Sequence, residues 1–140
     1  EDCRRQRQMC IRDRASSVLA PDDVFKIIET SARNNSRDDL TGFLIFAENR
    51  FFQVVEGSRS AIDALLSRLG EDTRHSQIEI LSQTEIAQRA FPNWRMKRLK
   101  PDTKIGAPIG ETPGLDHFPT HLKHLVRQFL AASQPATEAA

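Results

Sequence analysis

The chain has 140 residues and a mass of 15.9 kDa, which favours a single domain. Its 20 basic and 19 acidic residues leave a formal charge of +1, which excludes the broad basic surface expected of a nucleic-acid-binding protein. No apolar run approaches the ~20 residues of a membrane-spanning helix, and no secretory signal is visible in the charged N-terminal residues. We therefore expect a cytoplasmic globular protein with no membrane or nucleic-acid partner.

The N-terminal segment 1–14 differs in character from the rest of the chain. Its apolar cluster at 9–11 is flanked by charged residues, so the pattern predicts a weak strand at most. The string MCIRDR also resembles translated sequencing-adapter sequence, and we interpret 1–14 as a degraded or artefactual first-strand segment. Its cysteines, Cys3 and Cys10, are too few for a disulfide framework and have no metal-ligand pair beside them.

A regular helical pattern begins at Pro21. Proline suits the first helical position, and the acidic residues after it suit the positive end of the helix dipole. Apolar residues recur at helical spacing, which predicts a helix from 21 to 34 or 35. Two apolar runs, 40–47 and 51–57, follow on either side of a short polar break and predict a β-hairpin.

The second half of the compact region repeats the order of helix and strand. Ser60 followed by Asp63 is typical of a capping box, which predicts a second helix that ends at Gly70. A strand is predicted from Ile78, and a short last strand is predicted where Trp94 and Met96 alternate with basic residues. This order predicts an α+β fold with two helices on one face of a mixed sheet.

The C-terminal region is expected to extend beyond that fold. Residues 101–119 hold four prolines and three glycines, which predicts an extended linker. Apolar residues at helical spacing between Leu122 and Leu130 predict a final helix, and we expect a disordered tail from Ser133.

Three amide side chains occupy positions that are usually apolar. Helical spacing puts Asn35 on the stripe of Val24 and puts Asn34 near that of Ile27. The pair either ends the helix, since asparagine tolerates a helix C-cap, or presents amides to the edge of a polar ring. Gln53 lies in mid-strand, and its amide can both donate and accept hydrogen bonds, as a switch requires.

The combination NN-x4-LTGFL-x6-FFQVVEG, followed by F-x2-W-x-M, resembles the BLUF family of blue-light sensors, which bind FAD. The match runs without gaps from about Ala15 to Leu99. We therefore divide the chain into segment 1–14, a BLUF domain at 15–100, and a linker, helix and tail at 101–140. The resemblance implies a ferredoxin-like βαββαββ mixed sheet with two helices on one face, to which the C-terminal helix is added.

The resemblance also implies where FAD is bound. The isoalloxazine ring should lie between the two helices, with its pyrimidine edge bonded by Asn35. Arg68 is expected either to contact the ribityl-phosphate arm or to be a solvated helix residue. The signalling residues implied are Gln53, Trp94 and Met96. The implied cofactor-binding set is Ile27, Ile28, Asn34, Asn35, Leu44, Gln53, Arg68 and Asp72; the family also has a position at His75, to which we assign no role.

The family mechanism requires a residue that this sequence lacks. In the family, light drives an electron and then a proton from a first-strand tyrosine, and the glutamine, here Gln53, rearranges its hydrogen bonds so that the absorption shifts to the red. Counting back without gaps places that tyrosine at Ile11, and the chain contains no tyrosine at all. Isoleucine can neither donate an electron nor bond Gln53. Either segment 1–14 has lost the native strand, or the chain binds flavin without the photocycle, with Trp94 as another possible donor.

We consider three functions. The first is a non-enzymatic FAD-binding photoreceptor that signals to an unidentified downstream protein, with a homo-oligomer possible. The second is a light-insensitive flavin-binding or protein-interaction module. The third is an enzyme on the same scaffold, against which the lack of a nucleophile–base set argues. His117, His121 and His124 lie close in sequence, but no carboxylate or cysteine completes a ligand set, so no metal is expected.

Overall fold

The computed structural model describes residues 6–17, 19–99 and 118–132. Among these residues, no helix is long and apolar enough to cross a membrane. The predicted linker and tail lie almost entirely outside the described residues. The elements in chain order are β1 (Gln6–Ala15), α1 (Pro21–Arg37), β2 (Thr41–Ala47), β3 (Arg50–Gly57), α2 (Arg59–Glu71), β4 (His75–Ile86), β5 (Arg95–Arg98) and α3 (Thr120–Ala132).

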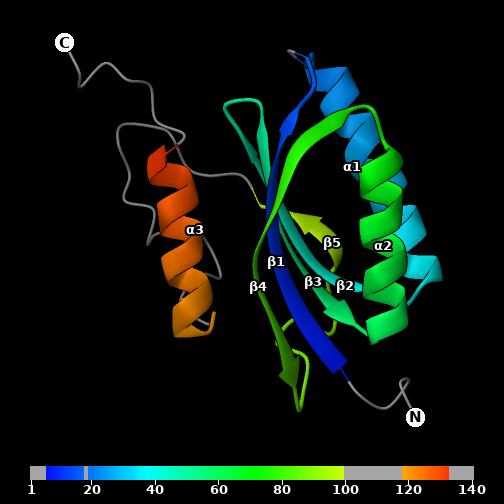
Figure 1. The fold of residues 1–140 in the computed structure, drawn as a ribbon, viewed down its shortest axis with the longest axis vertical. Helices are drawn as coiled ribbons and strands as arrows, with labels where there is room; N and C mark the ends of the chain where they lie inside the picture. The colour runs from blue at the N-terminus through cyan, green and yellow to red at the C-terminus, as the bar shows by residue number, and fades with distance from the viewer. Residues whose placement is uncertain (1–5, 18, 100–117, 133–140) are drawn as a thin grey trace.

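The strands form one five-stranded mixed sheet with the order β4-β1-β3-β2-β5. All neighbouring pairs are antiparallel except β2 and β5, which are parallel. Helices α1 and α2 cover one face of the sheet, and α3 lies against the opposite face (Figure 1). The predicted α+β, ferredoxin-like arrangement with an added C-terminal helix is therefore confirmed.

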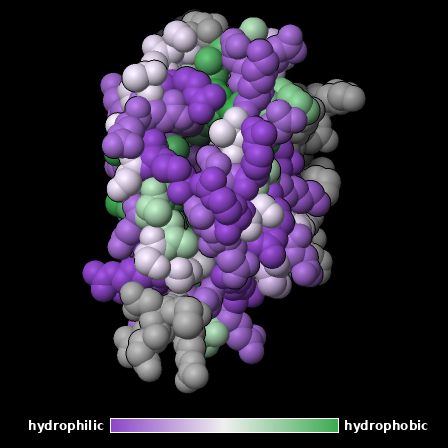
Figure 2. All heavy atoms as spheres, turned by 90° about the vertical axis from the view of Figure 1, so that its right-hand side faces the viewer, coloured by the Kyte–Doolittle hydropathy of each residue, from purple (hydrophilic) through white to green (hydrophobic). Residues whose placement is uncertain are grey.

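The sheet separates two apolar layers because side chains alternate along each strand. On β3, Phe51 and Val55 belong to the layer under α1 and α2, whereas Phe52 and Val54 belong to the layer under α3. The surface that α1 and α2 turn to solvent is mostly hydrophilic (Figure 2). Alternation places Gln53 on the α1/α2 side of the sheet, as the sequence predicted.

Strand β1 is longer than the sequence predicted. It spans ten residues and pairs on both sides, with β3 and with β4. Met9, Cys10 and Ile11 have no exposed surface. Few apolar residues are enough for this strand because its two neighbours satisfy its backbone groups along most of its length.

The second helix begins directly after Gly57, as the sequence predicts, but both predicted caps are wrong. The N-cap of α2 is Ser58, whose hydroxyl accepts a hydrogen bond from the backbone N–H of Ala61 at 3.2 Å. The capping box expected at Ser60 does not form, because Ser60 is already inside the helix. The helix also continues past Gly70, and its C-cap is Asp72.

Candidate functional site

A narrow cleft lies between α1, α2 and the start of β4. Its volume is about 40 Å³. Four residues of the predicted cofactor-binding set, Asn34, Asn35, Arg68 and Asp72, line it. The other residues that line it are Thr30, Ser31, Leu65, Leu69, Arg74 and His75.

The decisive group in the cleft is the side-chain amide of Asn35. The residue is fully buried, and neither its Oδ1 nor its Nδ2 has a hydrogen-bond partner among the described residues. Leaving a buried amide group unpaired costs about 1–3 kcal/mol per group, so such groups are rare without a ligand or water. The alternative that the asparagines end the helix is wrong, because α1 continues to Arg37 and its C-cap is Asp38.

Arg68 reaches the same cleft from α2. Its Nη1 donates to Asp38 Oδ2 at 2.8 Å, which fixes the guanidinium between the two helices. Its Nη2 is buried and has no partner among the described residues. Arg68 is therefore not simply a solvated helix residue, and it has one donor group left to offer a ligand.

Asp72 lines the cleft but is bound by a neighbour. Arg74 donates to its carboxylate through Nη2 at 2.7 Å and through Nε at 3.0 Å. These hydrogen bonds lower the pKa of Asp72 below its ordinary value. The carboxylate stays ionised at neutral pH and keeps Arg74 folded back beside the cleft.

A buried acid–base pair that the sequence analysis missed lies next to the cleft. Asp13 Oδ1 is 2.9 Å from His75 Nδ1, and both side chains are buried. Burial raises the pKa of Asp13, although the hydrogen bond from His75 opposes this shift. Asp13 Oδ2 has no partner among the described residues. Asp13 lies on the same face of β1 as the buried residues Met9 and Ile11, and this alternation could have predicted that its carboxyl group points inward.

Gln53 lies in the sheet beneath the helices. It is 2% exposed, and its register partners are Ile11 on β1 and Leu44 on β2. The residue at the expected tyrosine position is thus directly opposite the glutamine. Leu44 and Ile27 are buried in this layer and Ile28 packs against it, so all three share the side of the sheet on which Gln53 lies. None of these four residues lines the cleft itself.

The structure separates the other two signalling residues. Met96 is buried in the α1/α2 layer, whereas Trp94 packs in the α3 layer, stacked on Phe91 with ring centroids 5.4 Å apart. Regular alternation would place both on one face. The backbone at Met96 has a positive φ of 63°, and the β2–β5 register shifts beside it, so alternation is broken there.

A second buried carboxylate, Glu56, was also missed. It has no exposed surface and accepts hydrogen bonds from the backbone N–H groups of Ala90 at 2.9 Å and Phe91 at 2.8 Å. Gln8 Nε2 donates to it at 2.8 Å, and Gln8 Oε1 lies 3.1 Å from His121 Nε2 on α3. Glu56 therefore ties β3 to the β4–β5 connection and, through Gln8, to α3.

Comparison with known proteins shows the family of the chain. The family model described as sensors of blue-light using FAD (BLUF) matches residues 8–97. The chain belongs to the BLUF family. The matched region includes most of β1.

This chain covers very different shares of its BLUF relatives. BlrB, described as a BLUF protein in its dark state, is 26% identical, with a TM-score of 0.70 over 93% of this chain and 98% of BlrB. A bacterial light-regulated adenylyl cyclase matches with 26% identity and a TM-score of 0.70, over 91% of this chain and 34% of the cyclase. The photoactivated adenylate cyclase subunit beta of Euglena gracilis is 28% identical over 71 residues, or 51% of this chain. This chain covers only 8% of that subunit.

Proposed function

We propose that this BLUF domain binds FAD with the isoalloxazine ring between α1 and α2, and that Gln53 is the switch that reports blue light when β1 carries a tyrosine. The observation that carries the proposal is the fully buried amide of Asn35, whose donor and acceptor both lack a partner in the part of the chain that the structure describes. The pyrimidine edge of an oxidised flavin presents neighbouring N–H and C=O groups, which are complementary to a side-chain amide. When bound, the flavin supplies blue-light absorption and an excited state that accepts an electron.

The other residues of the predicted cofactor-binding set, in the cleft and in the apolar layer beside it, have separate roles in this proposal. Asn34 supports the ring edge beside Asn35, while Ile27, Ile28 and Leu44 supply the apolar layer against the ring faces. Arg68 offers its unpaired Nη2 to the polar arm, and Asp72, held by Arg74, lines the outer end of the cleft.

Because FAD and FMN share the ring that Asn35 would recognise, their discrimination must come from groups along the arm, and titration with each cofactor separates the two.

The light response depends on the pair formed by Gln53 and residue 11. A glutamine amide can reverse its donor and acceptor by rotation, which makes it a suitable switch. Its cross-strand partner, Ile11, can neither release an electron nor form a hydrogen bond. We propose that the chain with isoleucine at this position binds flavin but does not form the red-shifted state, and that a tyrosine in β1 restores the response.

The output would pass to another protein or domain. The Euglena relatives are named as adenylate cyclase subunits, and this chain covers less than a tenth of the subunit beta described above. We propose that the shared segment is the sensor alone, and that Met96 and Trp94, which lie on opposite faces near Gly42 of β2, carry the change from the flavin side towards α3.

The test compares light-minus-dark absorption spectra of FAD-loaded proteins. We expect no red shift in the unmodified chain, a red shift in Ile11→Tyr, and its loss in Ile11→Tyr combined with Gln53→Leu. Ile11→Phe is the matched control, because it adds the aromatic ring without the phenol. A red shift in the unmodified chain or in Ile11→Phe would show that another group, such as Trp94, supplies the electron, and would overturn the pairing of Gln53 with residue 11.

A further inference from the structure

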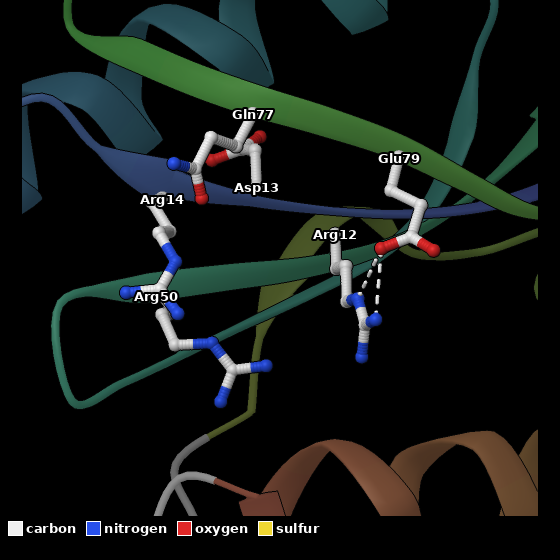
Figure 3. Close-up of a pocket in the computed structure, with 6 residues that line it drawn as sticks. All are labelled: Arg12, Asp13, Arg14, Arg50, Gln77 and Glu79. Carbon is white, nitrogen blue, oxygen red and sulfur yellow. Dashed lines mark hydrogen bonds and ion pairs between the residues drawn. The ribbon is translucent and has the colours of Figure 1, made fainter.

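A second hollow lies on the opposite side of the sheet from the flavin cleft. Its volume is about 330 Å³, and it is lined by Arg12, Asp13, Arg14, Arg50, Gln77 and Glu79. The three arginine side chains extend from the sheet towards the side on which α3 lies (Figure 3). We infer that this hollow binds a small phosphate-bearing anion, independently of the proposed flavin function.

Strand geometry gathers the three guanidinium groups. Arg12 and Arg14 are two residues apart on β1 and therefore share a face, and Arg50 on β3 is the register partner of Arg14. Like charges directly opposite each other in a sheet are destabilising. Burial, and then the charges of Arg12 and Arg14, lower the pKa of Arg50, which fits this crowding. An anion between the guanidinium groups would relieve their repulsion.

The hollow already holds two of these side chains in place. Arg12 donates to Glu79 Oε1 from Nε at 2.9 Å and from Nη2 at 2.8 Å. The guanidinium of Arg50 lies 4.8 Å from the centre of the Phe129 ring on α3. Arg14 is exposed and completes the set. Groups fixed in this way lose little conformational freedom when a ligand binds.

The charge and size of the hollow favour a small ligand. Three arginines share the hollow with the carboxylate of Glu79, whereas the Asp13 carboxyl group points to the other face of the sheet, where it bonds His75. The hollow falls within the usual range of about 300–1,000 Å³ for small-molecule sites. Guanidinium groups recognise phosphate through paired N–H donors. The formal charge of +1 on the whole chain offers no extended basic track, so we infer a small phosphate compound rather than a polynucleotide.

The test titrates inorganic pyrophosphate into the full chain by calorimetry at low salt, with and without saturating FAD. We expect saturable binding in both cases, because the flavin cleft lies on the other face of the sheet. Arg14→Gln should weaken binding at least tenfold, while Arg33→Gln, which removes an exposed arginine from α1, should leave it unchanged.

Three results would overturn the inference. The first is the absence of saturable binding, and the second is equal weakening by Arg14→Gln and Arg33→Gln. The third is loss of pyrophosphate binding on addition of FAD, which would place the anion in the flavin cleft beside Arg68. Thermal unfolding provides a second readout: pyrophosphate should raise the Tm of the unmodified chain and of Arg33→Gln more than that of Arg14→Gln.

Discussion

Replacing Asn35 by leucine should change stability and flavin affinity in opposite directions. The buried amide of Asn35 leaves one donor and one acceptor unpaired among the described residues. A leucine of similar size removes both groups without opening a large cavity. In the absence of flavin, Asn35→Leu should therefore stabilise the protein, whereas in the presence of flavin it removes the groups that recognise the ring edge.

The size of both effects follows from the two unpaired groups. At about 1–3 kcal/mol each, they cost about 2–6 kcal/mol in the flavin-free protein. The different shape of leucine introduces packing strain of about 1–3 kcal/mol, which offsets part of the stability gained by removing the unpaired groups. We expect a net gain of about 2 kcal/mol in the free energy of unfolding, or roughly 6 °C in Tm for a domain of this size. Losing two hydrogen bonds to flavin should cost at least about 2 kcal/mol, or about 30-fold in affinity.

The assay combines urea unfolding of the flavin-free proteins with FAD titration followed by flavin fluorescence. Asn93→Leu, which replaces an exposed amide in the β4–β5 connection, is the matched control and should change neither quantity appreciably. Destabilisation of the flavin-free protein by Asn35→Leu would show that the amide is satisfied within the protein. Equal FAD affinity of the unmodified and Asn35→Leu proteins would refute its role in holding the ring.

The two buried carboxyl groups give further predictions. In Glu56→Gln the side chain accepts hydrogen bonds only at its one oxygen, so one of the donors now bonded to Glu56, such as the Phe91 N–H, loses its acceptor. The free energy of unfolding in urea should therefore fall by about 2–4 kcal/mol. A fall of less than about 0.5 kcal/mol would contradict a stabilising role of these hydrogen bonds. The pKa of Asp13 is raised in the folded protein, so the ionised carboxylate destabilises the fold at pH values above that pKa. This destabilisation disappears as the pH falls and the carboxyl group becomes protonated. Asp13→Asn, which can still accept from His75, should therefore be more stable than the unmodified chain at neutral pH, with a difference that shrinks towards about pH 4. A difference that grows on acidification, measured by urea unfolding, would show that the ionised Asp13–His75 pair is stabilising.

Local periodicity was enough to place the residues that face the α1/α2 side of the sheet. Helical spacing put Asn35 on the buried stripe of α1, and strand alternation put Gln53 on the same side of the sheet as Phe51 and Val55. The family motif, together with a gapless count, placed Ile11 where the structure shows the cross-strand partner of Gln53. Which residues share a face depends only on a regular backbone, so the spacing of residues in the sequence is enough to predict it.

Local sequence failed where a hydrogen bond or an irregular backbone decided the outcome. The choice of Ser58 over Ser60 as N-cap depends on where the first turn of α2 forms. Trp94 and Met96 share a face under regular alternation, but the positive φ of Met96 and the register shift between β2 and β5 place them in opposite layers.

Only the tertiary structure could show which polar groups are paired. Asp13 and His75 are 62 residues apart, and they meet because β1 and β4 are neighbours in the sheet. The guanidinium groups of Arg14 and Arg50 come together through the register of β1 and β3. That the amide of Asn35 lacks a partner among residues 6–17, 19–99 and 118–132 is likewise a property of its surroundings, since residues on α2 and β4 complete the cleft that it lines. Satisfaction of a buried polar group depends on every element packed around it, and no stretch of sequence by itself contains that information.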